Sequence, residues 1–407
     1  MSNNQTSALS PETLPRSSVR LAELALALGG FGIGTGEFAI MALLPDIARD
    51  LHVTIPSAGH LISSYALGVL IGAPVLAVFG ARLDRRKLVF LFMALFAFGN
   101  LASAFMQNYD GLILMRFVAG FPHGAYFGVA SLVAASMAEP GKRAQAVGRV
   151  MTGLTVATLV GTPLATWLGQ IAGWRAMFAA VGLIAILTMV MISVFVPKQP
   201  AEEGASPLRE LGALRRKQVL LTLAIGAVGT GGLFSVFSYV AATITEVSHV
   251  DMMWMPIVFA MFGLGMVLGN IVGSNLTDRS VMGTVGGVLL YDLAVMLAFP
   301  FLMQHPATAF LSVLLVGGGF ALVPALQTRL MDVAADAQTL AAALNHSALN
   351  LANALGAWLG GLAIAWGYGW TATGTVGAFL AVAGLAVFAV SLLMDRITRQ
   401  KAALVAE

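Results

Sequence analysis

The chain of 407 residues is 58% hydrophobic and only 10% charged, and it contains 45 glycines, no cysteine and a formal net charge of +3. Soluble domains carry about 25% charged residues, so this composition excludes a soluble protein and is typical of an integral membrane protein. The lack of cysteine excludes disulfides and thiolate metal sites, and the high glycine content suits helices that pack closely in a bilayer.

Apolar runs of about 20 residues recur along the chain, and each is long enough to cross a hydrocarbon core of about 30 Å as a helix. Residues 1–20 are polar and predict a disordered tail, and the apolar run that follows is too long for a cleaved signal peptide. Six spans are predicted before a charged linker and six after it, at residues 21–44, 57–79, 88–106, 111–136, 143–168, 174–196, 218–245, 252–274, 281–303, 306–329, 337–366 and 370–394.

The predicted domains follow from these spans. A six-helix bundle occupies residues 21–196, a polar linker residues 197–217, a second six-helix bundle residues 218–394 and a tail residues 395–407. Most of the 22 lysines and arginines lie in the two tails and in alternate connections. By the positive-inside rule this distribution places both termini and the linker in the cytoplasm.

The two halves repeat each other. GTGEF at 34–38 aligns with GTGGL at 229–233, and the pair Asp84-Arg85 aligns with Asp278-Arg279 at nearly the same offset. Because each half crosses the membrane six times, the copies run parallel and are related by an axis along the membrane normal. This repeat geometry is found in secondary transporters, which hold their substrate between the two halves.

Three stretches carry a resemblance to a known family: GARLDRRK (80–87), RFVAG (116–120) and GLTVATLVGTP (153–163). Together they resemble the major facilitator superfamily over essentially the whole chain, and they are similar to its arabinose-efflux-permease-like branch of twelve-span drug:proton antiporters. The sequence departs from the family's loop signature at two places. Arg82 stands where that signature usually has Leu, and the corresponding loop of the second half, GSNLTDR (273–279), is one residue out of register with it. We expect a weaker contact from that second loop.

The resemblance implies an all-α membrane protein with two pseudo-symmetric six-helix bundles, a monomer in the bacterial cytoplasmic (inner) membrane. It implies proton-coupled efflux of a sugar, a nucleoside or a drug, with protons and the small solute as partners, no nucleic acid and no cofactor beyond the proton gradient. A proton symporter or a uniporter is the alternative. The chain has no G-x-x-x-x-G-K-[ST], which disfavours an ATP-driven pump. It has no H-E-x-x-H, no cysteine and no loop long enough for a catalytic domain, so we do not expect an enzyme.

Glu37 and Arg116 lie well inside predicted spans, where burying a charge costs roughly 2.5–3.5 kcal/mol. The stretch GTGEFA at 34–39 fits a dinucleotide fingerprint, but the apolar run around it has no turn, which excludes that function. Glu37 and Arg116 fall at similar depths in spans that the resemblance places side by side. A carboxylate that is ionised beside Arg116 and protonated away from it would couple protons; a static ion pair is the alternative.

Further polar and aromatic residues are candidates for the cavity. His123 follows Arg116 by seven residues on nearly the same helix face and could relay protons, bind substrate or simply pack. His346, Asn350 and Asn353 form a polar stripe that could bind hydroxyls or amides, with interhelical hydrogen bonding as the alternative. The aromatic candidates for substrate binding are Phe38, Tyr126, Phe127 and Tyr239, for which helix packing is an equally good explanation.

Two groups of residues are candidates for gating. Asp84 could cap the helix that begins near residue 337 while the halves are closed on the cytoplasmic side, and Arg85 would hold Asp84 in place. Pro163 removes a backbone hydrogen bond and should kink the fifth span. Gly153 and Gly161 in the same span should pack closely against a neighbouring helix.

Overall fold

The computed structural model describes residues 15–53, 55–200, 206–335 and 337–406, and within them every regular element is helical. In the described part of the chain, twelve helical segments are long and apolar enough to cross a membrane, and each coincides with one of the predicted spans. Most of the predicted N-terminal tail lies outside the described residues. The first helix begins at Arg16, so residues 16–20 are helical and not part of a disordered tail.

The first half contains spans 1 to 6. Its elements are α1 (Arg16–Asp50), α2 (Ile55–Gly80), α3 (Arg85–Phe105), α4 (Tyr109–Gly120), α5 (His123–Ser136), α6 (Arg143–Val156), the π-helical turn η1 (Ala157–Gly161), α7 (Thr162–Ala172) and α8 (Trp174–Phe195). The side chains of Asp84 and Asn108 accept hydrogen bonds from backbone N–H groups in the first turns of α3 and α4, which fixes where those helices begin. Gly173, at a φ of 87°, makes the sharp connection from α7 to α8.

The second half repeats this order after a short linker helix. Its elements are α9 (Pro207–Leu211), η2 (Gly212–Arg215), α10 (Lys217–Gly229), α11 (Gly231–Phe237), α12 (Val240–Glu246), η3 (Met252–Trp254), α13 (Met255–Arg279), α14 (Val281–Leu302), α15 (Pro306–Gly318), η4 (Gly319–Ala321), α16 (Leu322–Val333), α17 (Gln338–Ala365) and α18 (Ala372–Ala406). Helix α18 continues through most of the predicted C-terminal tail.

Several spans are interrupted where the sequence carries proline or glycine. Span 4 breaks between α4 and α5 at Pro122, which cannot donate a backbone hydrogen bond. Span 5 passes through the π-helical turn η1 directly before Pro163, in agreement with the predicted kink. These irregular turns lie inside the protein, where neighbouring helices can satisfy the freed backbone groups.

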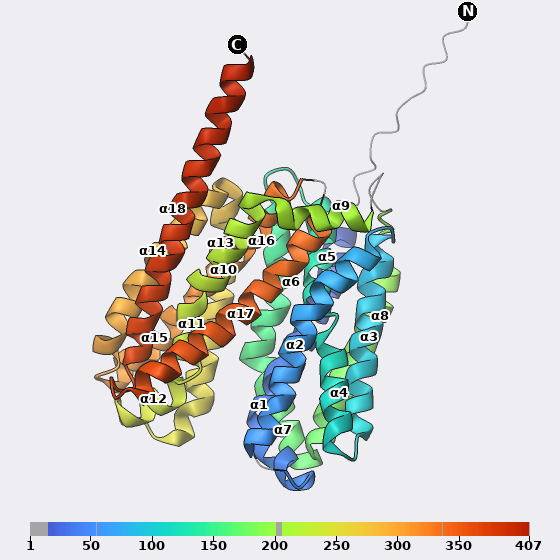
Figure 1. Ribbon diagram of the computed structural model, residues 1–407. Coiled ribbons are helices and arrows are strands. Elements are labelled where there is room, and N and C mark those ends of the chain that lie inside the picture. The colour runs from blue at the N-terminus through green and yellow to red at the C-terminus, as the bar shows by residue number, and fades with distance from the viewer. Residues whose placement is uncertain (1–14, 54, 201–205, 336, 407) are drawn as a thin grey trace, which may run out of the picture.

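The two halves pack against each other mainly through three helix pairs. Helix α17 of the second half lies along α2 and α5 of the first, and α13 lies along α6. Figure 1 shows the two groups of helices close together at the end where α1 begins and α18 ends, and farther apart at the opposite end. We call these the termini end and the far end.

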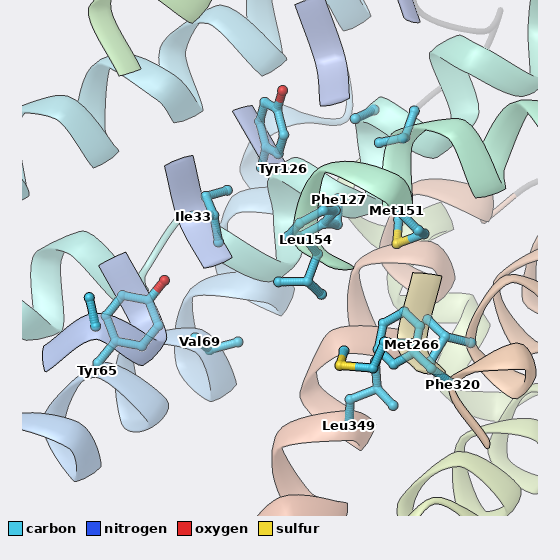
Figure 2. Close-up of a cluster of buried hydrophobic side chains, with 14 of the residues drawn as sticks. Ile33, Tyr65, Val69, Tyr126, Phe127, Met151, Leu154, Met266, Phe320 and Leu349 are labelled. Atoms are coloured by element: carbon cyan, nitrogen blue, oxygen red, sulfur yellow. The ribbon is translucent and has the colours of Figure 1, made fainter. Parts of the chain in front are cut away.

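A continuous apolar core fills the middle of the molecule and crosses the boundary between the halves. Met151 and Leu154 of α6 lie near Met266 of α13, Phe320 of η4 and Leu349 of α17 (Figure 2). The halves therefore meet at mid-depth through side-chain packing as well as through polar contacts. Any rearrangement that separates them at this depth must expose part of this core.

Candidate functional site

A cavity lies between the two halves at mid-depth, and Glu37 of α1 is on its wall. Among the described residues that line it, Glu37 is the one acid. Both halves contribute to the lining, which consists of Glu37, Phe38, His123, Leu154, Thr158, Leu233, Phe234, Phe237, Phe262, Met266, Phe320, His346, Leu349, Asn350 and Asn353. The wall is thus mostly apolar and aromatic, with a few polar groups, which is the usual character of a small-molecule site.

The cavity is small in this structure. Its volume is about 50 Å³, which is room for only a few water molecules. Sites for drug-sized ligands are commonly about 300–1,000 Å³. The halves must therefore move apart, or side chains must rotate, before a solute of that size can enter.

Glu37, His123 and Tyr65 form a chain of polar groups at the wall of the cavity. The Oε2 atom of Glu37 is 4.0 Å from Nδ1 of His123, and the same Nδ1 is 3.1 Å from the hydroxyl oxygen of Tyr65. His123 opens α5 directly after Pro122, so the helix break determines its position. Tyr65 comes from α2 and was not among the sequence candidates, because a lone tyrosine in an apolar span carries no distinctive pattern.

Arg116 is buried next to this chain but does not pair directly with Glu37. Its Nη1 atom donates to the backbone carbonyl of Gly36 at 3.2 Å, and its guanidinium carbon lies 4.3 Å from the centre of the Tyr65 ring. The two side chains make no ion pair within 4.0 Å, so the predicted direct contact is wrong for this conformation. The guanidinium is held instead by the Tyr65 ring and by the carbonyl of Gly36, the residue that precedes Glu37 in the chain.

The polar stripe predicted on span 11 does face the cavity. His346, Asn350 and Asn353 all line it, although the Asn350 amide also donates to the His346 carbonyl at 3.0 Å. The ring of His346 is 5.3 Å from that of His123 across the boundary between the halves, measured between centroids. The Nε2 atom of His346 is buried and has no hydrogen-bond partner among the described residues.

The aromatic candidates divide into those that line the cavity and those that pack. Phe38 lines it, whereas Tyr126, Phe127 and Tyr239 do not. The Tyr126 hydroxyl donates to the Leu26 carbonyl at 2.8 Å, so this ring joins α5 to α1.

The other two rings also serve helix packing. Phe127 is fully buried and stacks on His346, with ring centres 4.3 Å apart. The Tyr239 hydroxyl donates to the Ala357 carbonyl on α17 at 2.8 Å. The aromatic lining comes largely from the second half instead, through Phe234, Phe237, Phe262 and Phe320.

Of the two repeated aspartates, Asp278 contacts the other half at the termini end, and Asp84 does not. The two carboxylate oxygens of Asp278 accept from the backbone N–H groups of Ala144 and Gln145 at 2.7 and 3.0 Å, at the start of α6. Asp84 caps its own helix through the N–H of Lys87 at 3.1 Å. The expectation that the second-half loop makes the weaker contact is therefore wrong.

The start of α17, which Asp84 was expected to cap, receives a different carboxylate. The N–H of Leu340 donates to Oε2 of Glu210, on the linker helix α9, at 2.9 Å. Arg85 donates its backbone N–H to the carbonyl of Gln199, also in the linker region, at 2.9 Å. The linker thus occupies the place that the sequence assigned to the loop between α2 and α3.

The glycines predicted to pack closely in span 5 do so. A Cβ atom on Gly153 would collide with the backbone of α1 at Ala27, and one on Gly161 would collide with the side chain of Thr35. Together with Pro163 they give span 5 an irregular, closely packed face against α1. This face holds α1, and with it Glu37, in position.

One ion pair, between a buried acid and a half-exposed arginine, was missed by the sequence analysis. Glu23 of α1 is almost fully buried, and its carboxylate accepts from Nε and Nη2 of Arg149 on α6 at 2.6 and 2.8 Å. Both residues lie near predicted span ends, where charges are common, so depth alone did not distinguish them. The pair joins spans 1 and 5 on the termini side of the cavity.

Comparison with known proteins gives consistent matches over the length of the chain. Residues 26–357 match the family model described as Major Facilitator Superfamily. The "Inner membrane transport protein YdhP" of Escherichia coli (strain K12) is 42% identical over 368 residues, covering 90% of this chain and 94% of that protein. The "Putative transporter AraJ" of the same strain is 34% identical over 382 residues, covering 93% and 96%.

Two further matches differ in what they show. The "Chloramphenicol resistance protein" of Streptomyces lividans is 34% identical over 340 residues, covering 81% of this chain and 86% of that protein. The crystal structure of the human organic anion transporter MFSD10 superposes with a TM-score of 0.74, covering 92% of this chain and 100% of that one. At 17% sequence identity the structural match supports the fold alone.

Proposed function

This chain belongs to the major facilitator superfamily, and on that premise we propose that it exports a small organic solute in exchange for protons. Its relatives are membrane transporters and not enzymes, so transport of a small molecule across the membrane is its activity. Export by proton antiport is the finer step that we propose. The observation that carries it is Glu37, an acid on the wall of a largely apolar cavity between the two halves.

The position of Glu37 supports a role in proton coupling. A carboxyl group in an apolar cavity changes its protonation as nearby charges and water change, and alternating access changes both. Arg116 lies next to it but is held by the Gly36 carbonyl and the Tyr65 ring. Arg116 can therefore influence the carboxylate without being locked to it, as a permanent ion pair would be.

His123 extends this group toward α2. Its Nδ1 atom is near both the Glu37 carboxylate and the Tyr65 hydroxyl. Gain or loss of a proton at Glu37 would therefore change the electrostatic environment of both His123 and Tyr65. In the proposed cycle the substrate enters from the cytoplasm and displaces the proton from Glu37, directly or through Arg116 and His123. The loaded protein then opens outward, releases the substrate, and Glu37 is protonated again from the more acidic exterior.

The conformation fits one stage of this cycle. The polar contacts between the halves at Asp278 and Asn270 lie toward the termini end, which the lysine and arginine distribution predicts to be cytoplasmic. We therefore assign the structure to a state closed toward the cytoplasm. In this conformation the cavity is too small for a drug-sized solute.

The class of solute follows from the lining and from one relative. Aromatic and aliphatic side chains cover most of the wall, with amides at Asn350 and Asn353 and an imidazole at His346 to orient polar groups. The resemblance to a chloramphenicol resistance protein favours a drug-like solute. A thermal-shift screen of antibiotics, nucleosides and sugars would identify ligands, because a ligand that binds the folded state raises its apparent stability.

The test uses the purified protein in liposomes with an imposed pH gradient and radiolabelled chloramphenicol, or the best ligand of the screen. Glu37→Gln should abolish gradient-driven accumulation while leaving exchange without a gradient. Glu23→Gln is the matched control, since it makes the same change on the same helix but at a residue held by Arg149. Full coupling in Glu37→Gln would refute the proposal, and solute movement in the direction of the protons would indicate a symporter.

A further inference from the structure

A second and much larger cavity lies away from the central one, on the outer side of the second half. It has a volume of about 560 Å³ and lies between α13, α14 and the end of α15. The lining includes Leu268, Val272, Leu276 and Arg279 of α13 and Gly287 and Tyr291 of α14. We call it the α13–α14 groove.

The α13–α14 groove is open to the membrane and almost wholly apolar. Leu268, Val272 and Leu276 expose between 42% and 54% of their surface, as lipid-facing residues of a membrane helix do. Gly287 lines the groove, and a Cβ atom built there would enter open space, with no atom within 4 Å. The two helices therefore leave a hollow at this point that no side chain of the described protein fills.

The one charged residue in the lining stands at the groove's termini end. Arg279 is the last residue of α13, is exposed, and makes no hydrogen bond or ion pair among the described residues. The carboxylate of the neighbouring Asp278 accepts its hydrogen bonds from the N–H groups at the start of α6 and not from Arg279. An exposed guanidinium is thus available at the mouth of an apolar groove.

The length of the groove matches one leaflet. From Ser280 to Tyr291 along α14 the distance is about 16 Å at 1.5 Å per residue. Half of a hydrocarbon core is about 15 Å. A chain that starts at the membrane surface beside Arg279 would therefore end near the bilayer centre beside Tyr291.

We propose that the α13–α14 groove is a binding site for an anionic phospholipid, with one acyl chain in the hollow at Gly287 and the phosphate beside Arg279. The apolar walls match an acyl chain, and the guanidinium is complementary to phosphate, which it can bind through two parallel hydrogen bonds. Basic pockets between membrane helices on the cytoplasmic side bind acidic lipid headgroups by the same chemistry. The site is independent of the substrate cavity and of the direction of transport.

Native mass spectrometry of the full-length protein in detergent tests the proposal. Phosphatidylglycerol and phosphatidylcholine with identical acyl chains would be titrated separately, and the first lipid bound would be measured. The wild type should bind phosphatidylglycerol about fivefold more tightly, as one basic residue near a headgroup provides. Arg279→Gln should remove this preference, and Gly287→Leu should weaken the first site for both lipids.

Two matched controls separate the groove from general effects. Arg82→Gln removes one exposed positive charge from the corresponding loop of the first half, and Gly59→Leu adds a side chain at another glycine whose Cβ atom would meet nothing within 4 Å. Both should bind lipid as the wild type does. A preference that survives Arg279→Gln, or a first site that survives Gly287→Leu, would overturn the proposal. So would a protein dimer that is lost with Gly287→Leu, since the groove would then be an interface between two copies.

Discussion

The contact between Asp278 and the start of α6 should control how often the termini end is closed. Asp278 accepts two backbone hydrogen bonds from the other half, and Ala at this position would leave both N–H groups without their acceptor. Asp84 is the corresponding residue of the repeat, but it caps α3 within its own half. We therefore expect Asp278→Ala to shift the equilibrium between closed and open states, and Asp84→Ala to leave it nearly unchanged.

The size of the shift can be worked from the contact. A capping side chain at a helix N-terminus contributes about 0.5–2 kcal/mol, and a negative charge there adds up to about 1 kcal/mol at partly exposed positions. Water replaces part of this when the halves separate, so we expect a net loss of about 1–2 kcal/mol. Since 1.4 kcal/mol is a factor of ten, the closed population should fall about 5- to 30-fold relative to the open one.

The absence of cysteine makes the measurement direct. Spin labels would be attached at Arg82→Cys and Asn275→Cys, two exposed positions on opposite halves near the termini end. Pulsed electron paramagnetic resonance would then report the distance between the halves. Asp278→Ala should move population from a short to a long distance. Asp84→Ala should lower the stability of the start of α3, as seen by thermal unfolding, without changing the distance distribution.

Two outcomes would refute this assignment. Equal shifts in Asp84→Ala and Asp278→Ala would show that both loops hold the halves together, as the repeat in the sequence suggests. An unchanged distribution in a folded Asp278→Ala protein would show that apolar packing alone determines closure. In either case the hydrogen bonds to α6 would not be the controlling contact.

Three further changes have definite expected outcomes. Glu23→Gln should lower the stability in detergent by about 1–3 kcal/mol, because it removes charge-assisted hydrogen bonds to Arg149. Thermal unfolding of Glu23→Gln, of Arg149→Gln and of the double variant would show the coupling between the two side chains as non-additive losses of stability. A hydrogen bond from Arg175 lowers the pKa of Asp50. The ionised Asp50 carboxylate should therefore contribute its full share of the folding stability above the unfolded-state pKa of about 3.9. That contribution should be lost as the pH falls through the lower folded-state pKa. Asp50→Asn should flatten this acid dependence in a plot of Tm against pH. Gly128→Val should favour the open state in the spin-label assay, since a Cβ atom there would lie 2.5 Å from the backbone nitrogen of Ala343 on the other half; a distribution like that of the wild type would contradict it.

The sequence predicted the architecture well because hydrophobicity along a membrane helix is a local property. All twelve spans coincide with helices of the structure, and the irregular turn in span 5 lies just before Pro163, where proline removes a backbone donor. The depth of Glu37 and the cavity-facing stripe at His346 could be predicted for the same reason. Helical periodicity places a residue at a depth and on a face without knowledge of its neighbours.

The partners of the candidate residues could not be predicted in the same way, because they depend on how helices pack. Arg116 lies at the expected depth, but its hydrogen bond goes to the Gly36 carbonyl, and a sequence pattern carries no information about a backbone acceptor. Tyr126 sits on the same helix as His123 yet faces α1 instead of the cavity. A difference of less than one helical turn separates a packing residue from a lining one.

The repeat explains why the cavity acid has no counterpart in the second half. By the repeat offset Gly232 corresponds to Glu37, and a Cβ atom on Gly232 would lie 2.9 Å from the Gly377 carbonyl oxygen. Backbone packing of α11 against α18 thus leaves no room for an acid at that position. The aspartates do recur, but Glu210 of the linker binds the start of α17, so of the two repeated aspartates it is Asp278 that contacts the other half. The linker is therefore part of the closing contact and not merely a connection between the bundles.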